Sequence, residues 1–394
     1  MLRLSCSNRF EILQDQLLDR LACGRDPVFS PWQIIVPSAA IRRRVELACA
    51  DRFGIAANLE SPYLAQWLWQ QIGRVVAVPE ISPFSPASLS WRIFELLGDA
   101  VFVEAQPRLH HYLKQADEVM RLDLAVRVAQ LLEHYITYRP HWLAVWSAGT
   151  SVGLPGGAED EVWQAALWRR IADELGIRRQ HPAALFFETI EKLGEQAACR
   201  AGLPDCAHIF CLPAMPPLYL EILRRLSRWM EIDLYVLNPC REYWFEIVDR
   251  KRLSYLATRQ QDLFHEVGNS LLASWGRQTQ AHIDLLFADA GQIVEENSHF
   301  QPSTDKSLLA ALHNALLDLE ELTPGSVPLA EGDRSIEIHV CHSLTRELEV
   351  LQDQLLGLFV EDEGLKPGDI LVLTPDLEAA APLGLGTGKG AAFV

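Results

Sequence analysis

The chain begins with two short apolar runs, and each is followed by a segment with apolar residues at helical spacing. Leu2–Ser5 and Gln33–Val36 have the length and composition of buried strands. Phe10–Leu21 follows the first run as a helix, and a second helix follows Pro37 and continues to Ala50. This strand–helix–strand–helix order predicts a parallel sheet with helices on its faces.

The pattern changes from about Ser61 to Leu193, where long amphipathic helices replace the apolar runs. The first pattern then returns as a strand at Ala207–Leu212, a helix at Leu218–Met230 and a strand at Ile232–Leu237. The sequence therefore predicts an α/β domain whose sheet is interrupted by an inserted, mostly helical subdomain.

A further α/β unit is expected near the C-terminus, with strand Ser335–Cys341, helix Leu344–Phe359 and strand Ile370–Leu373. Gln260–Pro328 is polar and weakly periodic, typical of a loop with short helices, and Ala379–Val394 has neither a helix nor a strand pattern. Because this last unit stops part-way, we interpret the chain as a truncated or frame-shifted product. The expected divisions are the first part of the α/β domain at 1–60, the helical subdomain at 61–200, the rest of the α/β domain at 201–334, the start of a second such domain at 335–377 and a low-complexity tail at 378–394.

Composition is that of a folded protein without a membrane anchor. The 394 residues are 49% hydrophobic and 22% charged, which predicts two or three globular domains. There is no apolar signal segment and no run of about 18 apolar residues, so we expect a soluble, cytoplasmic protein. A formal charge of −17 argues against diffuse adhesion to DNA, so any phosphate-binding surface must be local.

The eight cysteines contain no C-x-x-C pair, as is usual for buried thiols in a reducing compartment. The nearest approach to a metal cluster is Cys206-x-His208-x-x-Cys211, which lies in an apolar run. A strand would send these side chains to both of its faces, so core packing is favoured and no metal site is predicted.

Catalytic patterns are missing from the sequence. The turn after the first strand, from Ser5 to Arg9, has neither the glycines nor the lysine of a phosphate-binding loop. The glycine-rich Gly384–Gly390 has the wrong spacing for such a loop, and the strand ending at Cys211–Pro213 carries no acid for Mg²⁺. We find no G-x-S-x-G motif, no Ser/His/Asp grouping and no acidic nuclease cluster.

Nucleic-acid contact is left open by the residues alone. Local basic groups occur at Arg42–Arg44, Arg169–Arg170, Arg178–Arg179 and Arg250–Arg252, and aromatic side chains that could stack on bases are Trp67, Trp69, Tyr138, Trp142, Tyr243 and Trp244. For each of them taken singly, a solvated helix face or a core aromatic is the favoured explanation.

Several longer strings together resemble one family. They are Phe53–Asn58, Tyr138–Leu143, Leu237–Trp244, Leu271–Gly276, His339–Ser343 and Arg346–Leu351. In this order, up to about Asp376, they resemble the N-terminal part of the RecC family, the gamma chain of bacterial exodeoxyribonuclease V.

The resemblance implies a superfamily-1 helicase-like (RecA-like) parallel sheet that lacks ATPase motifs. Ser7, Asn8 and Arg9 would then be degenerate positions of a nucleotide site. It implies no cofactor in this chain, with ATP and magnesium held by RecB-type and RecD-type partners of a heterotrimer. Such a complex repairs double-strand breaks by recombination, and the gamma chain binds duplex ends, helps to separate the strands and scans the emerging single strand for Chi.

The family's strand-scanning channel implies four candidate DNA-binding residues. Trp69 could stack on a base, Leu131 could pack against one, and Glu133 could accept a hydrogen bond from one. Arg139 could pair with a phosphate or base edge, or form an internal salt bridge instead. Two alternatives stay open: an active AddB-type helicase–nuclease subunit, whose nucleotide loop or iron–sulfur cysteines are not seen here, and a protein–protein scaffold without DNA contact.

Overall fold

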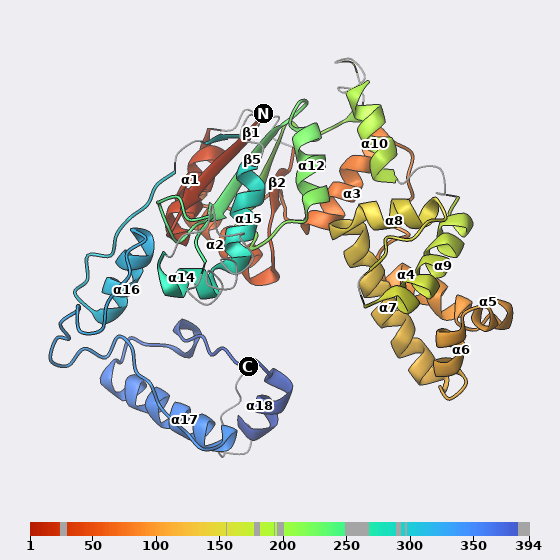
Figure 1. Ribbon diagram of the computed structural model, residues 1–394. Coiled ribbons are helices and arrows are strands. Elements are labelled where there is room, and N and C mark those ends of the chain that lie inside the picture. Colours follow the sequence, from red (N-terminus) through yellow and green to blue (C-terminus); the bar gives the residue numbers. More distant parts are fainter. Residues whose placement is uncertain are drawn as a thin grey trace. The chain divides into compact units, whose positions relative to one another are not determined.

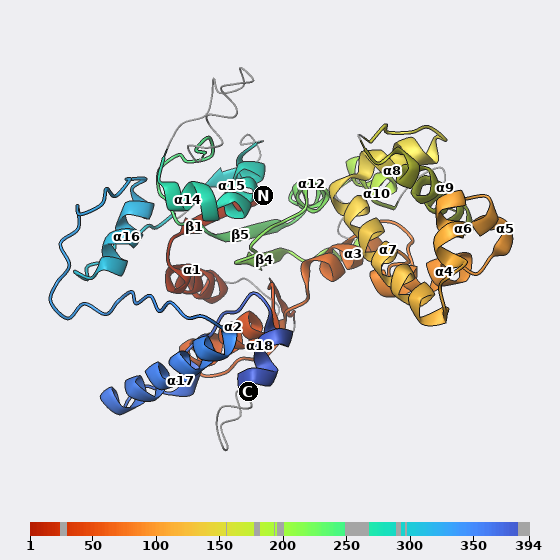
Figure 2. The ribbon, with the colours of Figure 1, turned by 60° about the horizontal axis from the view of Figure 1, so that its bottom comes forward.

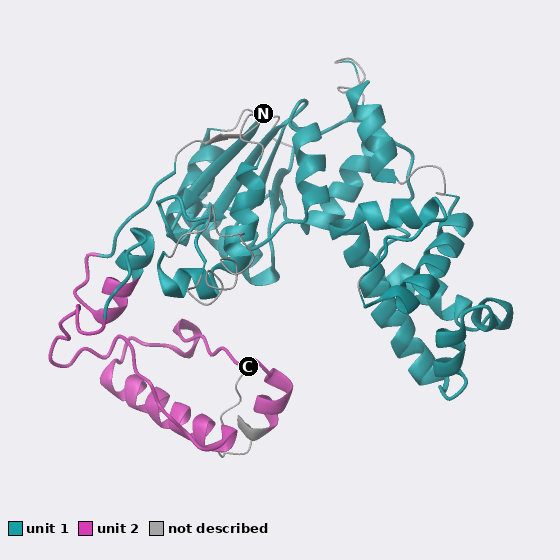
Figure 3. Ribbon diagram, in the orientation of Figure 1, with its two compact units in different colours: residues 1–303, 313–323 teal, residues 304–312, 324–394 magenta. Residues whose placement is uncertain are grey.

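The computed structural model describes most of the chain. The described residues are 1–23, 30–154, 156–176, 182–192, 194, 201–248, 268–288, 293–295 and 298–384. They form two compact units, one of residues 1–303 with 313–323 and the other of residues 304–312 with 324–394 (Figure 3).

The first unit is built on a parallel sheet of six strands in the order β3-β2-β4-β5-β1-β6 (Figure 1). The strands are β1 (Leu2–Ser7), β2 (Trp32–Ile35), β3 (Leu59–Glu60), β4 (Cys206–Phe210), β5 (Glu231–Leu237) and β6 (Ile293–Glu295). Strands β4 and β5 follow the helical insertion and pair between β2 and β1. The prediction of an α/β protein with an interrupted parallel sheet is confirmed.

Helices cover both faces of this sheet (Figure 2). On one face, α1 (Phe10–Ala22) and α2 (Ala39–Phe53) pack against alternate residues of the strands, including Ile34 and Phe210. On the other face, a larger core joins Leu4 and Leu234 to α3 (Leu64–Val75), α10 (Pro182–Glu191), α12 (Pro217–Leu226), α14 (Ser270–Trp275) and α15 (Arg277–Phe287). The alternation of strand side chains thus supplies two cores from one sheet.

The insertion has a core of its own. Its helices are α4 (Pro86–Leu96), α5 (Ala100–Glu104), α6 (Pro107–Leu113), α7 (Glu118–Tyr138), α8 (Pro140–Ser147) and α9 (Ala158–Glu174). Buried Trp146 donates its indole N–H to Glu161 at 2.9 Å, and that carboxylate also accepts the backbone N–H groups of Val152, Gly153 and Leu154. These donors lower the pKa of Glu161 to about 2, although burial alone would raise it.

The chain after β5 contains more regular structure than the sequence pattern indicated. The segment expected to be a loop with short helices includes α15, whose Ile283 and Leu286 are buried against the sheet, and α16 (Leu308–Leu317). It also supplies the edge strand β6, which was not expected. A strand of three residues is too short to give a recognisable apolar run.

The second unit contains α17 (Leu344–Glu361), as predicted, and a short 3-10 turn η1 (Pro367–Asp369). Ser335–Cys341 and Ile370–Leu373, predicted as strands, form no ladder with any described residue. Val340 and Leu373 are 95% and 84% exposed. A strand needs a neighbour to pair with, and no other described segment supplies one.

The end of the described chain also differs from expectation. Residues predicted to lack structure include helix α18 (Leu377–Gly384), and most of Gly384–Gly390 lies outside the described residues. Among the described residues, no helix combines the length and the apolar character needed to cross a membrane.

Candidate functional site

The sheet changes direction at the carboxyl ends of β1 and β5. Helix α1 leaves β1 over one face toward β2, whereas α14 and α15 follow β5 over the other face and lead to β6 on the far side of β1. Ligands of open α/β sheets bind in the crevice at such a reversal. This edge is therefore where a nucleotide would be expected, and it contains Ser7, Asn8 and Arg9.

The turn at this edge is too short to surround a phosphate. Only Asn8 and Arg9 separate β1 from α1, whereas a phosphate-binding loop needs about eight residues. The buried Ser7 hydroxyl accepts the backbone N–H of Arg9 at 3.0 Å, which closes the turn on itself. Glu11 adds a carboxylate in the first turn of α1, where a bound anion would meet like charge.

Backbone from two other segments fills the same crevice. The Asn8 side-chain amide donates to the Gln301 carbonyl and accepts the Gln301 N–H, both at 2.9 Å. His299 donates its backbone N–H to the carbonyl of Cys6 at 3.0 Å, and Asn238 donates to the carbonyl of Ser7 at 2.9 Å. The chain itself therefore takes up the hydrogen-bonding groups that would otherwise face a ligand.

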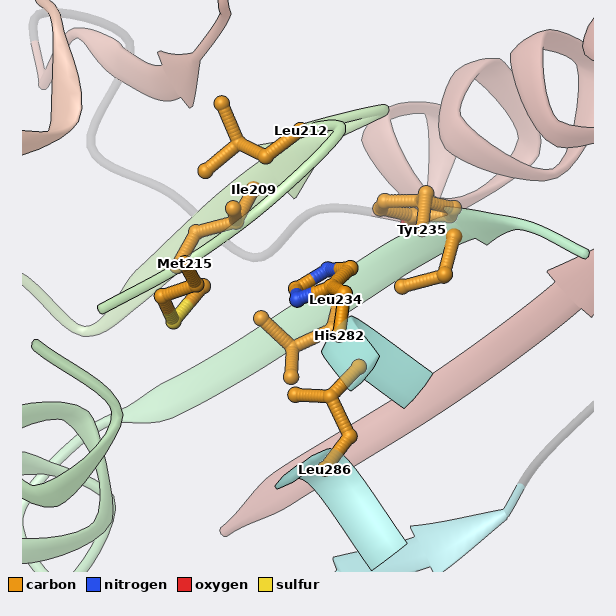
Figure 4. Close-up of a pocket in the computed structure, with 8 residues that line it drawn as sticks. Ile209, Leu212, Met215, Leu234, Tyr235, His282 and Leu286 are labelled. Carbon is orange, nitrogen blue, oxygen red and sulfur yellow. The ribbon is translucent and has the colours of Figure 1, made fainter. Parts of the chain in front are cut away.

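The carboxyl end of β4 likewise lacks the groups of a magnesium site. Its last turn is Cys211-Leu212-Pro213, as the sequence indicated, and Cys211 has a left-handed backbone with φ 51°. Beside it lies a small cavity of about 10 Å³, lined mainly by aliphatic side chains and His282 (Figure 4). Such a volume holds about one water molecule and excludes a nucleotide.

The structure separates the four candidate DNA-binding residues. Trp69, on α3, is half-buried, donates its indole N–H to the Pro79 carbonyl at 2.8 Å and meets the Phe84 ring edge-on at 6.4 Å. No contact among the described residues joins Trp69 to the other three. Its contacts are those of a packing residue with one accessible side.

The other three candidates lie along or just after α7. Glu133 is near Tyr219 of α12, and burial together with that carboxylate raises the pKa of Tyr219 to about 12. Leu131 is half-buried, and Arg139 ends the helix with its side chain exposed. The guanidinium of Arg139 lies over the Trp142 ring, 5.6 Å from its centroid, and makes no ion pair in the described part of the chain. Of the two roles left open for Arg139, an internal salt bridge is therefore not seen among the described residues.

Arg139 lies within an aromatic group at the junction of α7 and α8 that the sequence only partly indicated. The rings of His134 and Tyr138 lie 6.2 Å apart, and those of His141 and Trp142 are also 6.2 Å apart. His134, Tyr138 and His141 are exposed. Exposed rings interleaved with a free guanidinium are the groups that bind unpaired bases and their phosphates. We call His134, Tyr138, Arg139, His141 and Trp142 the α7–α8 junction.

A polar cluster lies at the opposite, amino-terminal edge of the sheet. His208 of β4 is in register with Asp233 of β5, and Cys206 extends from the same strand and face as His208. The Asp233 carboxylate forms ion pairs with Arg3 of β1 at 2.6 Å and Arg20 of α1 at 3.2 Å. Burial, followed by the Asp233 charge, raises the pKa of Cys206 to about 12. Cys211, the third residue of the sequence pattern, lies beyond the other end of β4 and takes no part.

Comparison with known proteins decides the family. The family model for the N-terminal domain of RecC matches residues 2–319. The chain belongs to the RecC family. Among curated RecC proteins, each named RecBCD enzyme subunit RecC, it is 35% identical to that of Escherichia coli K12 over 97% of this chain. It is 29% identical to that of Haemophilus influenzae over 95% of the chain and 27% identical to that of Mycolicibacterium smegmatis over 97%.

This RecC-family chain spans only part of its relatives. The aligned region is 37% of the Escherichia coli protein, 38% of the Haemophilus protein and 34% of the Mycolicibacterium protein. The match covers the filled crevice and the α7–α8 junction, since both lie within residues 2–319.

Proposed function

We propose that this chain is a non-catalytic, DNA-handling part of a RecC-type subunit of the helicase–nuclease exodeoxyribonuclease V. In this proposal it works in the cytoplasm with RecB-type and RecD-type subunits, which hold the ATP and magnesium. The complex binds broken duplex ends, separates the strands and scans the emerging single strand for Chi during recombinational repair.

The closed crevice supports the non-catalytic role independently of the family match. The crevice at the sheet reversal, where a motor protein of this architecture would hold its nucleotide, is closed by Asn8, Asn238 and the Ser298–Gln301 segment. We infer a superfamily-1 helicase-like sheet in which the nucleotide position has become a packing contact. The same feature disfavours an active AddB-type motor.

DNA contact is proposed at the α7–α8 junction. The exposed rings supply stacking surfaces, and Arg139 supplies a charge that the described side chains leave without a carboxylate partner. Trp69, Leu131 and Glu133 remain proposed contacts of the wider channel.

Salt-dependent binding of a fluorescent single-stranded or forked oligonucleotide to the purified chain tests this proposal. Arg139→Ala should lower the slope of log affinity against log salt by about one, and Trp142→Ala should weaken binding by about 5- to 150-fold. Arg127→Ala is the matched control, because Arg127 is an exposed arginine of the same helix that pairs with Asp123 at 2.9 Å. Equal affinity of all three variants and the wild type would remove the junction as a DNA site. No binding by any of them at low salt would instead favour the protein–protein scaffold.

Nucleotide binding is tested separately with a fluorescent ATP analogue and Mg²⁺. We expect no saturable binding and no ATP hydrolysis, with or without DNA. Turnover that disappears in Ser7→Ala or Arg9→Ala would contradict the proposal and favour the motor alternative.

A further inference from the structure

The amino-terminal edge of the sheet holds three metal-ligating groups that the proposed DNA function does not use. One ligand atom each from Cys206, His208 and Asp233 lies within 4.8 Å of the others. His208 and Asp233 are 1% and 5% exposed, while Cys206 is half-buried and gives the group access to solvent. Burial of this kind holds the donors in place before any ligand arrives.

The arrangement of His208 is the observation that points to a ligand. Its Nδ1 is 3.2 Å from an oxygen of the Asp233 carboxylate, yet that nitrogen makes no hydrogen bond. A buried ring nitrogen without a hydrogen-bond partner is unfavourable, because nothing compensates for its loss of hydration. A cation bound to this nitrogen and to the Asp233 carboxylate would supply that compensation.

The spacing of the donors suits a tetrahedral ion. With the usual zinc bond lengths to sulfur, nitrogen and oxygen, ligand atoms of a tetrahedral site are about 3.3–3.6 Å apart. Here the His208 Nδ1 and the Cys206 Sγ lie 3.2 Å and 3.8 Å from the same Asp233 oxygen, and one ligand atom of each residue lies within 4.8 Å of the others. Movement of the Cys206 side chain toward Nδ1 would complete three corners, which leaves the fourth for water.

A zinc ion can bind beside two arginines if it takes the place of one of them. Arg3 contacts the Oδ1 of Asp233, whereas the oxygen that faces His208 is Oδ2, which pairs with Arg20 at 3.2 Å. The Arg20 side chain is 37% exposed and also pairs with Glu231, so it can leave Asp233 and keep a partner. Zn²⁺ bound to one thiolate carries a single positive charge, which equals that of the guanidinium it would displace.

We propose that Cys206, His208 and Asp233 form a zinc-binding site at the amino-terminal edge of the sheet. Binding forms bonds from Zn²⁺ to sulfur, a ring nitrogen and a carboxylate oxygen, releases the thiol proton to solvent and moves Arg20 onto Glu231. The site joins β4 to β5, so zinc should stabilise the fold. It is independent of the DNA-binding proposal, because none of its residues belongs to the α7–α8 junction.

Cobalt substitution and metal analysis test the site on the purified chain. Co²⁺ added to metal-free protein should give a thiolate-to-cobalt charge-transfer band that saturates at one equivalent and is displaced by Zn²⁺. Thermal unfolding should shift to higher temperature with Zn²⁺. Cys206→Ser should abolish the band, and His208→Phe, which keeps a ring in the same space, should weaken binding by more than tenfold. Cys211→Ser is the control, since Cys211 is a buried thiol of the same segment without nearby ligands.

Arg20→Gln separates this proposal from an adventitious thiol site. Removal of the competing guanidinium should tighten zinc binding by about tenfold or more. The proposal is overturned by a wild-type chain without a charge-transfer band, by a band that persists in Cys206→Ser, or by Arg20→Gln that weakens binding.

Discussion

Acid should destabilise the first unit through His282, which lines the small cavity beside β4 and β5 (Figure 4). His282 is 5% exposed, and its Nδ1 has no hydrogen-bond partner in the described part of the chain. Burial lowers its pKa from the ordinary 6.5 to about 4. In the folded chain the imidazole is therefore neutral at pH values where the unfolded chain protonates it.

The direction in which the free energy of unfolding changes with pH depends on which state, folded or unfolded, binds the proton. Between pH 6.5 and about 4 the unfolded state binds more protons, so the free energy of unfolding falls as the pH falls through this window. The difference between the two pKa values corresponds to about 3 kcal/mol, and most of it is lost by about pH 4. Below the folded-state pKa this residue causes no further loss.

Urea unfolding monitored by tryptophan fluorescence measures the effect at a series of pH values from 7 to 4. The variant His282→Leu keeps an apolar side chain against Leu286 and Met215 and removes the titrating group. We expect the wild type to lose about 3 kcal/mol more than the variant across this range, because carboxylates titrate equally in both. His134→Gln, a change at an exposed histidine, should behave like the wild type. Parallel curves for the wild type and His282→Leu would refute the reasoning, as would a measured His282 pKa near 6.5.

Three further substitutions probe contacts that position the candidate sites. Glu161→Gln should cost about 2–4 kcal/mol in thermal unfolding, because it replaces the charged acceptor of four N–H donors. Asn8→Ala should cost about 1–3 kcal/mol by the loss of both hydrogen bonds to Gln301, without any gain of ATP-analogue binding. Gly276→Ala should cost more than about 1 kcal/mol, since a Cβ would lie 2.5 Å from the Leu272 carbonyl oxygen, and Gly357→Ala, where a Cβ meets nothing, is its control in the same chemical denaturation assay.

The sequence predicted where most strands lie along the chain better than it predicted which strands pair with each other. Apolar runs such as Gln33–Val36 and Ile232–Leu237 correspond closely to β2 and β5 because strands buried on both faces are continuously apolar. The order of strands depends on pairing between distant segments, which local periodicity does not encode. The same limit explains Ser335–Cys341, where an alternating pattern is present but no described strand lies beside it to form a ladder.

In the candidate sites, too, residues close together in sequence could be recognised, whereas partners distant in sequence could not. The missing glycine and lysine after β1 are visible in the sequence, but the groups that close the crevice, such as Gln301, are almost 300 residues away. Cys206 and His208 form a visible pair, yet Asp233 joins them only through the register of β4 with β5. Cys211 is near this pair in sequence, but the strand carries it to the opposite end of the sheet.

Substitutions in the turn between β1 and α1 would not be enough to open the crevice to a nucleotide. Replacement of Ser7 by glycine and of Asn8 by lysine would restore phosphate-binding residue types, but α1 would still begin two residues after β1. The Ser298–Gln301 segment would still bond to β1, and Glu11 would still place a carboxylate in the first turn of α1. A nucleotide site therefore requires a longer turn and the removal of that segment as well. Under the proposed helicase-like architecture, the nucleotide position is thus closed by packing, which point substitutions in the β1–α1 turn do not reverse.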